Sequence, residues 1–101
     1  MAFIQIMECH TDRIDELMAL EEEWQQATKG RNTLRRAIVA RDRKDPQRHP
    51  VLVFFDSYES AMVNSGLPET EAFATRQQDL MDGPIVFSDL DVIDDRDLVG
   101  A

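Results

Sequence analysis

Two short segments constrain the fold more than any other feature of this chain. AFIQIMEC (residues 2–9) and PVLVFF (residues 50–55) carry apolar residues at both odd and even positions. Successive side chains of a β-strand point to opposite faces, so a strand of this kind is expected to be covered on both faces. The second segment stops abruptly at Asp56-Ser57, residue types that favour the start of a helix. The pattern predicts two central strands, the second of which runs directly into a helix.

A first helix is predicted over residues 11–30, between the two strands. Thr11 or Asp12 can cap its start, and Gly30 can adopt the left-handed conformation that ends it. Its apolar residues recur at helical spacing, and Glu21 is the acidic residue that interrupts them. The stripe consists of Ile14, Leu17, Met18, Trp24 and Thr28, widened by Leu20 and Ala27.

The middle of the chain predicts a β-hairpin. Residues 33–42 and 50–55 are strand-like and are joined by a polar turn, RKDPQRH, which suits one of the longer hairpin loops. By strict alternation, Leu34, Arg36 and Ile38 share one face of the first of these strands. Arg36 is therefore expected to be partly buried among apolar neighbours.

A broken helix and a last strand complete the chain. Ser57 can cap a short helix that ends at Gly66, and Pro68 suits the first position of a second helix. A stop signal at Gly83 precedes the final strand, residues 85–94.

This order of elements predicts a ferredoxin-like split βαβ fold, an α+β domain with an antiparallel four-stranded sheet. We expect a single domain over residues 1–101, with residues 95–101 as a frayed tail. Helices cover only one face of such a sheet, while the central strands are apolar on both. We therefore expect a homodimer in which the open sheet faces of two copies meet.

Composition narrows the functional classes. The net charge of −9 argues against a general nucleic-acid binder, because phosphate contacts require Lys and Arg. Residues 31–48 nevertheless carry +5, which leaves −14 on the rest of the chain. No apolar run approaches the roughly 20 residues of a membrane span. A single cysteine and no recognisable leader lead us to expect a cytoplasmic protein without membrane association.

Two longer motifs resemble a known family. VLVFFDSYESAMVNSGLPETEAF and LMDGPIVFSDLDVID are similar to segments of the antibiotic biosynthesis monooxygenase family, within the dimeric α+β barrel superfamily. The resemblance spans roughly residues 3–94. It implies a homodimer whose two sheets face each other and a pocket in each subunit between the sheet and the helices.

The resemblance also bears on cofactors. Asn64 stands where many members carry a His just before the helix break. Haem-degrading members carry a His near positions 76–77, where this chain has Arg76 and Gln77, and an Asn near position 7, where it has Met7. We therefore expect no haem and no other cofactor.

Six residues are candidates for a binding or catalytic site. Trp24, Met62 and Phe73 would line a pocket for a flat aromatic molecule, although a lone Trp on a helix stripe is also a common core residue. Asn64 and Tyr58 would orient a phenol or stabilise a developing oxyanion. The alternative is that Asn64 ends a helix and Tyr58 packs on the sheet.

Arg36 is the sixth candidate residue, and the Cys and His residues are considered as potential metal ligands. Arg36 could grip an anionic ligand, whereas the rest of the basic hairpin is expected to be a solvated surface. Cys9, His10 and His49 do not have the spacing of a metal site, which needs three or four converging ligands, so we expect no metal.

Two functions remain open at this stage. The first is a small cofactor-independent, monooxygenase-like enzyme that acts on a flat aromatic or phenolic molecule. The second is a non-catalytic dimeric module that binds a small molecule or a protein. Polar groups that converge on an apolar cavity would favour the first, and a filled interface between helices and sheet would favour the second.

Overall fold

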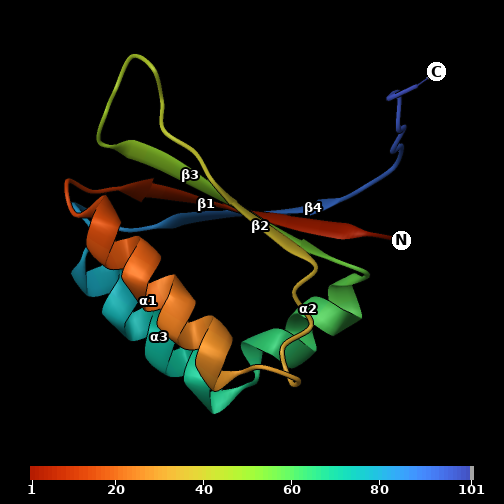
Figure 1. The fold of residues 1–101 in the computed structure, drawn as a ribbon, viewed down its shortest axis with the longest axis horizontal. Coiled ribbons are helices and arrows are strands. Elements are labelled where there is room, and N and C mark those ends of the chain that lie inside the picture. The colour runs from red at the N-terminus through yellow and green to blue at the C-terminus, as the bar shows by residue number, and fades with distance from the viewer. Residues whose placement is uncertain (101) are drawn as a thin grey trace.

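The computed structural model describes residues 1–100, and its four strands form one open antiparallel sheet in the order β2-β3-β1-β4. All three helices lie on one face of that sheet (Figure 1). This confirms the ferredoxin-like α+β fold. The elements are β1 (Phe3–His10), α1 (Ile14–Ala27), β2 (Arg36–Val39), β3 (Arg48–Phe55), α2 (Tyr58–Ser65), α3 (Pro68–Asp79) and β4 (Val86–Asp91).

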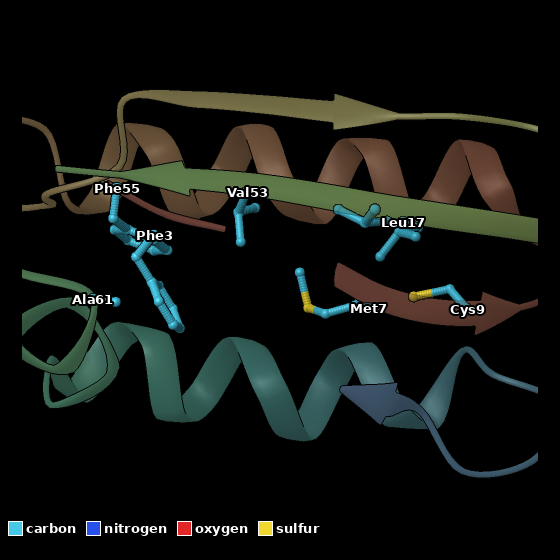
Figure 2. Close-up of a cluster of buried hydrophobic side chains, with 8 residues drawn as sticks. Phe3, Met7, Cys9, Leu17, Val53, Phe55 and Ala61 are labelled. Atoms are coloured by element: carbon cyan, nitrogen blue, oxygen red, sulfur yellow. The ribbon is translucent and has the colours of Figure 1, made fainter. Parts of the chain in front are cut away.

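The central pair of strands, β1 and β3, organises the core. They pair along their full length, beginning with Phe3 opposite Phe55, so that alternate residues of both strands face the helices. Figure 2 shows most of these side chains converging with Leu17 of α1 and Ala61 of α2. Burying one large apolar side chain contributes about 1.5–3 kcal/mol. The buried strand residues are Phe3, Met7, Cys9, Val51, Val53 and Phe55.

The other face of the sheet is also apolar and carries no helix. The strand pairing places one row of apolar residues from all four strands on this open face. Among them Val86 is 58% exposed and Leu90 is 44% exposed. The central strands are therefore covered on one face only within a single chain. The apolar residues of this open face are Ile4, Ile6, Ile38, Leu52, Phe54, Val86 and Leu90.

The start of α1 differs from the sequence prediction. Neither Thr11 nor Asp12 caps the helix, which begins at Ile14 with Arg13 at the N-cap position and no side-chain hydrogen bond there. Thr11 is instead fully buried, and its hydroxyl donates to the Leu80 carbonyl oxygen (2.7 Å) while accepting from the Arg13 N–H (2.9 Å). The hydroxyl thus joins the β1–α1 loop to the end of α3, a contact between segments far apart in sequence.

The end of α1 also falls short of residue 30. The helix ends at Ala27, and the buried Thr28 hydroxyl donates to the Trp24 carbonyl oxygen (2.7 Å). Gly30 does adopt the left-handed conformation (φ +82°), but in the turn beyond the helix. Met18, which the pattern assigned to the apolar stripe, is 46% exposed. The buried stripe repeats every three or four residues from Ile14, and Met18 lies beside it.

The two later helices begin as predicted. Ser57 caps α2, where its hydroxyl accepts from the Ser60 N–H (3.0 Å) and the Ser60 hydroxyl accepts from the Ser57 N–H (3.1 Å). Gly66 is the C-cap of α2 and Pro68 is the first residue of α3. The reciprocal hydrogen bonds between Ser57 and Ser60 satisfy two N–H groups at the start of α2 that would otherwise lack partners.

β2 is shorter than the predicted strand 33–42, and the alternation fails at its start. Thr33 bonds to α2 rather than to the sheet, because its hydroxyl donates to the Ser60 carbonyl oxygen (2.6 Å). Leu34 therefore packs on the helix side, opposite to the face predicted from its parity with Arg36. At the other end, Pro50 of β3 has no N–H with which to continue the ladder.

The last strand ends at Asp91 instead of residue 94, and residues 92–98 have no regular secondary structure. Of the expected frayed tail, residue 101 lies outside the described residues. The β2–β3 loop and the C-terminal segment both rise from the sheet on the side away from the helices (Figure 1). Among residues 1–100, no helix is long and apolar enough to cross a membrane.

We predict that Thr11→Val destabilises the protein by about 1–3 kcal/mol, because the change keeps the shape but leaves the Leu80 carbonyl oxygen without its buried donor. Urea unfolding followed by circular dichroism measures this. The control is Thr75→Val, which removes an exposed hydroxyl with one long contact (3.4 Å) and should stay within about 0.5 kcal/mol of the parent. Equal losses for both variants would contradict the structural role of Thr11.

Candidate functional site

A cavity of about 390 Å³ lies between the sheet and the three helices. This is within the range of about 300–1,000 Å³ that is usual for small-molecule sites. Its walls are mainly apolar and come from strands and helices alike. The apolar and aromatic lining residues include Met7, Trp24, Val53, Phe55, Phe73 and Phe87.

Four of the six residues singled out from the sequence meet at this cavity. Trp24 of α1, Met62 and Asn64 of α2, and Phe73 of α3 all line it. The Trp24 and Phe73 rings lie 6.2 Å apart between centroids at 54°, a tilted aromatic pair that joins the two helices. The Trp24 indole N–H donates to the Thr70 hydroxyl (3.0 Å), so its polar atom is satisfied.

Asn64 is the polar member of this group. Its side chain is 7% exposed, and its Oδ1 accepts a hydrogen bond from the Thr33 N–H (3.3 Å). This bond fixes the orientation of the amide. Among residues 1–100 the structure records no acceptor for its Nδ2, yet no fully buried side-chain atom lacks a partner. The Nδ2 group is therefore reachable, and Asn64 is one of the residues that line the cavity.

Tyr58 and Arg36 lie away from the cavity. Tyr58 is 47% exposed at the start of α2, and its ring packs edge-on against Phe3 (5.4 Å between centroids). Arg36 is on the open face of the sheet, where its guanidinium lies 5.9 Å from the centre of the Phe54 ring. The expectation that Arg36 is half-buried is wrong, because the strand ladder turns it toward solvent. The cavity thus combines only part of the predicted set.

Glu21 is a cavity residue that the sequence analysis passed over as an interruption of the α1 stripe. It lies at helical spacing between Leu17 and Trp24, so its side chain enters the space between α1 and the sheet. No hydrogen-bond partner is recorded for its carboxyl group among residues 1–100. Burial in these apolar surroundings raises the pKa of the Glu21 carboxyl to about 7.

Gln77 is a second polar residue that the sequence did not single out for the cavity. It is 2% exposed, and its amide nitrogen lies 3.8 Å from Met7 Sδ and 3.9 Å from Cys9 Sγ. Sulfur is a weak acceptor, so this amide is held loosely at the cavity wall. The sequence signal that could have identified Glu21 and Gln77 is a polar side chain on the apolar face of a helix.

Cys9 does not provide a nucleophile here. It is 1% exposed, and burial, with a smaller effect from the charge of Glu21, raises the pKa of its thiol to about 11. A thiol of this kind stays protonated at neutral pH and is inert. Within residues 1–100, no group of three or more His, Cys, Asp or Glu residues is arranged to hold a metal ion.

Comparison with solved structures places the fold among known proteins. A variant of SnoaB, a cofactor-independent oxygenase from Streptomyces nogalater, superimposes with a TM-score of 0.75 at 8% identity, over 93% of this chain and 94% of that one. A protein from Chloroflexus aurantiacus, provisionally named an antibiotic biosynthesis monooxygenase, gives 0.73 at 18% identity over 97% and 99%. A similarly named protein from Deinococcus radiodurans gives 0.74 at 14% over 99% and 100%.

Comparison at the level of sequence gives no match. No protein-family model and no curated protein matches the chain. The structural neighbours therefore establish that the chain has a monooxygenase-like fold, in agreement with the resemblance noted in its motifs. At such low identity the shared fold does not determine the activity, which depends on the residues of the cavity.

We predict that Glu21→Gln changes how stability depends on pH. The folded protein holds this proton more tightly than the unfolded chain, whose carboxyl has an ordinary pKa of 4.5. The parent's free energy of unfolding should therefore carry a favourable contribution below pH 4.5 that is lost as pH rises toward 7. The variant lacks this loss. Its free energy of unfolding should therefore rise by about 1–3 kcal/mol relative to that of the parent across that interval.

Urea unfolding at a series of pH values measures the difference between the two proteins. The control is Glu22→Gln, a matched change at the exposed neighbouring position on α1. Its stability should run parallel to that of the parent over the same interval. A parallel curve for Glu21→Gln would show that the Glu21 carboxyl is solvated in the folded protein.

Proposed function

We propose that the cavity binds a flat aromatic or phenolic small molecule and that the chain is a cofactor-independent, monooxygenase-like enzyme. The observation that carries this proposal is the convergence of polar side chains from three helices, among them Glu21, Asn64 and Gln77, on a mainly apolar cavity of suitable size. A filled interface between helices and sheet would have favoured the interaction module instead. The monooxygenase-like fold is consistent with this assignment.

The cavity residues suggest how such a molecule would be held. The rings of Trp24 and Phe73 and the thioether of Met62 offer apolar contacts to an aromatic system. The reachable Nδ2 of Asn64 would donate to a ring oxygen and stabilise negative charge that develops there. Because Thr33 already fixes Oδ1, the donor is held in place before the ligand arrives.

The proposed chemistry balances without a reductant. In the keto tautomer of a hydroxylated polycyclic arene, one ring carbon bears two hydrogens, and its oxygenation would place one atom of O2 in a new carbonyl group. The second oxygen atom would leave as water with both hydrogens. The substrate therefore supplies all the electrons, which is the reason that no cofactor is required for this class of reaction.

We predict that 2-naphthol binds beside Trp24 and that a hydroxylated tricyclic substrate consumes O2. The chain has one Trp, so a single indole N–H signal in an NMR titration reports on the cavity. Asn64→Asp keeps the oxygen that Thr33 uses but removes the Nδ2 donor. It should weaken naphthol binding about tenfold, the value of one hydrogen bond of about 1.4 kcal/mol.

Tyr58→Phe is the control, because Tyr58 packs outside the cavity. Loss of its hydroxyl group should leave naphthol binding unchanged. An oxygen electrode measures turnover with hydroxylated naphthalenes and anthracenes. Binding without oxygen consumption by any of them would favour the non-catalytic binding module. An indole signal that no aromatic compound moves would reject the cavity as a ligand site.

We further propose that the chain forms a homodimer through the open sheet face, which would close two sheets into a barrel. Burying the apolar row of this face is the physical reason, since a contiguous exposed patch of this kind marks an interaction surface. The aliphatic residues at its centre, Ile6 and Leu52, are directly paired on β1 and β3. A second copy is the simplest complementary partner.

The charge distribution is consistent with this dimer. The β2–β3 loop and the C-terminal segment both project past the open face (Figure 1). The loop carries Arg41 and Arg43, which are in none of the ion pairs among residues 1–100, and the C-terminal segment carries Asp95 and Asp97. Contacts between these segments across the dimer would each be worth only about 0–1 kcal/mol, so they would set register more than affinity.

We predict that the parent has twice the chain mass in light scattering at micromolar concentration and that Leu52→Asp is a monomer. The aspartate would be buried without a partner at the centre of the interface, which is costly. The control is Val63→Asp, an equivalent change at an exposed residue on the helix side. A folded parent that stays monomeric, or a dimer that Leu52→Asp leaves intact, would contradict this arrangement.

A further inference from the structure

The charges that line the cavity all have one sign. Two carboxyl groups, Glu21 of α1 and Glu71 of α3, are among its lining residues, while no Lys, Arg or His is. The nearby arginines of the helix layer are engaged elsewhere, since Arg76 pairs with Glu23 (2.9 Å) and Arg31 pairs with Glu69. A ligand in this cavity therefore meets negative charge without a compensating cation among the described lining residues.

Glu21 is the partly buried member of this pair, whereas Glu71 is exposed. Glu21 lines the cavity and has no recorded partner among residues 1–100, whereas no fully buried side-chain polar atom in that range lacks one, so its carboxyl oxygen atoms remain accessible to a ligand. Buried carboxyl groups in folded proteins are normally paired or hydrogen-bonded. An unpaired carboxyl that faces a ligand-sized space is therefore the expected partner of a group on the ligand.

The titratable and charged groups around Glu21 come from three elements. Across from it on β1 is the neutral Cys9 thiol, whose pKa is raised in part by the charge of Glu21. Glu71 lines the same cavity from α3 at an exposed position. Asp89 of β4 accepts a hydrogen bond from the amide of Gln5 (2.9 Å), and Gln5 lines the cavity. None of these groups supplies positive charge.

We propose that the cavity selects an aromatic ligand that carries a basic amine, and that the Glu21 carboxylate is the counter-ion of its ammonium group. This inference rests on the proposed function of the cavity as an aromatic-binding site and names the class of compound that it takes. The aromatic faces of Trp24 and Phe73 add to the attraction, because a cation within about 6 Å of such a face is stabilised by its quadrupole.

The alternative role for Glu21 is that of a base toward an acidic ligand. The anion left behind would then share the cavity with Glu71, and the described lining residues include no Lys, Arg or His to offset its charge. An anionic ligand such as a carboxylate would meet the same repulsion. An ammonium ligand neutralises the buried charge instead, so the charge pattern decides between the two roles.

The test uses three naphthalene probes of similar size and different charge. 1-Naphthylmethylamine is cationic, 1-naphthalenemethanol is neutral and 1-naphthoate is anionic. Binding is followed by the Trp24 indole signal in NMR titrations. At about pH 8 the amine should bind about tenfold more tightly than the alcohol, and the naphthoate should bind least, because a buried ion pair contributes more than an exposed one.

The pH dependence distinguishes Glu21 from the other carboxyl groups. Below the Glu21 pKa of about 7 the carboxyl is protonated and loses its attraction for the amine. Amine binding should therefore weaken about tenfold from about pH 8 to about pH 5.5, while alcohol binding stays level.

Matched variants locate the effect. Glu21→Gln should bind the amine and the alcohol alike at every pH, and its retained alcohol binding would show that the cavity is intact. Glu71→Gln removes the same charge at the exposed position and should keep the amine preference and its pH dependence.

The outcomes separate this inference from the function on which it rests. If the alcohol binds but the amine has no advantage, or if Glu21→Gln keeps that advantage, the counter-ion role is wrong and the aromatic cavity stands. Equal binding of naphthoate would also overturn it. If none of the three probes moves the indole signal, the aromatic cavity and the counter-ion role fall together.

Discussion

The full-length antiparallel pairing of β1 with β3 is the constraint on which the rest of the structure depends. The register that begins with Phe3 opposite Phe55 sends one set of side chains toward the helices and the other to the open face. A slip of one residue would exchange the two sets. Both sets are apolar here, so the same pairing creates the helix-covered core and the apolar face that has no cover within the chain.

The helices close over the sheet without filling the space beneath them. Phe3, Phe55 and Ala61 pack together at one end of the core, and Cys9 and Leu17 pack at the other (Figure 2). Between these ends the cavity remains, walled by Met7 and Val53 from the sheet. Protein interiors are normally close-packed, so a space of this size is a feature that folding stability alone does not explain.

The polar groups at the cavity carry a cost in the absence of a ligand. Within residues 1–100, Glu21 has no recorded hydrogen-bond partner, and the recorded contacts of the Gln77 amide nitrogen are with sulfur atoms. Replacing either by an apolar residue of similar volume is the solution expected if stability alone mattered. Neighbours with 8–18% identity share the fold. The chemistry of this chain therefore depends on which side chains occupy the cavity more than on the fold itself.

The sequence by itself determined the order of the elements, the apolar character of both faces of β1 and β3, and the helix starts at Ser57 and Pro68, because strand and helix periods and capping residues are local signals. It also singled out Trp24, Met62, Asn64 and Phe73 as candidate site residues. Only the tertiary structure showed that these four meet at a cavity and that Tyr58 and Arg36 lie outside it. It also showed that Glu21, which in the sequence interrupts the apolar stripe of α1, lines that cavity. Periodicity states which side of an element a residue occupies, whereas the partner across the gap depends on contacts between segments far apart in the chain, such as Thr33 with Asn64 and Thr11 with Leu80.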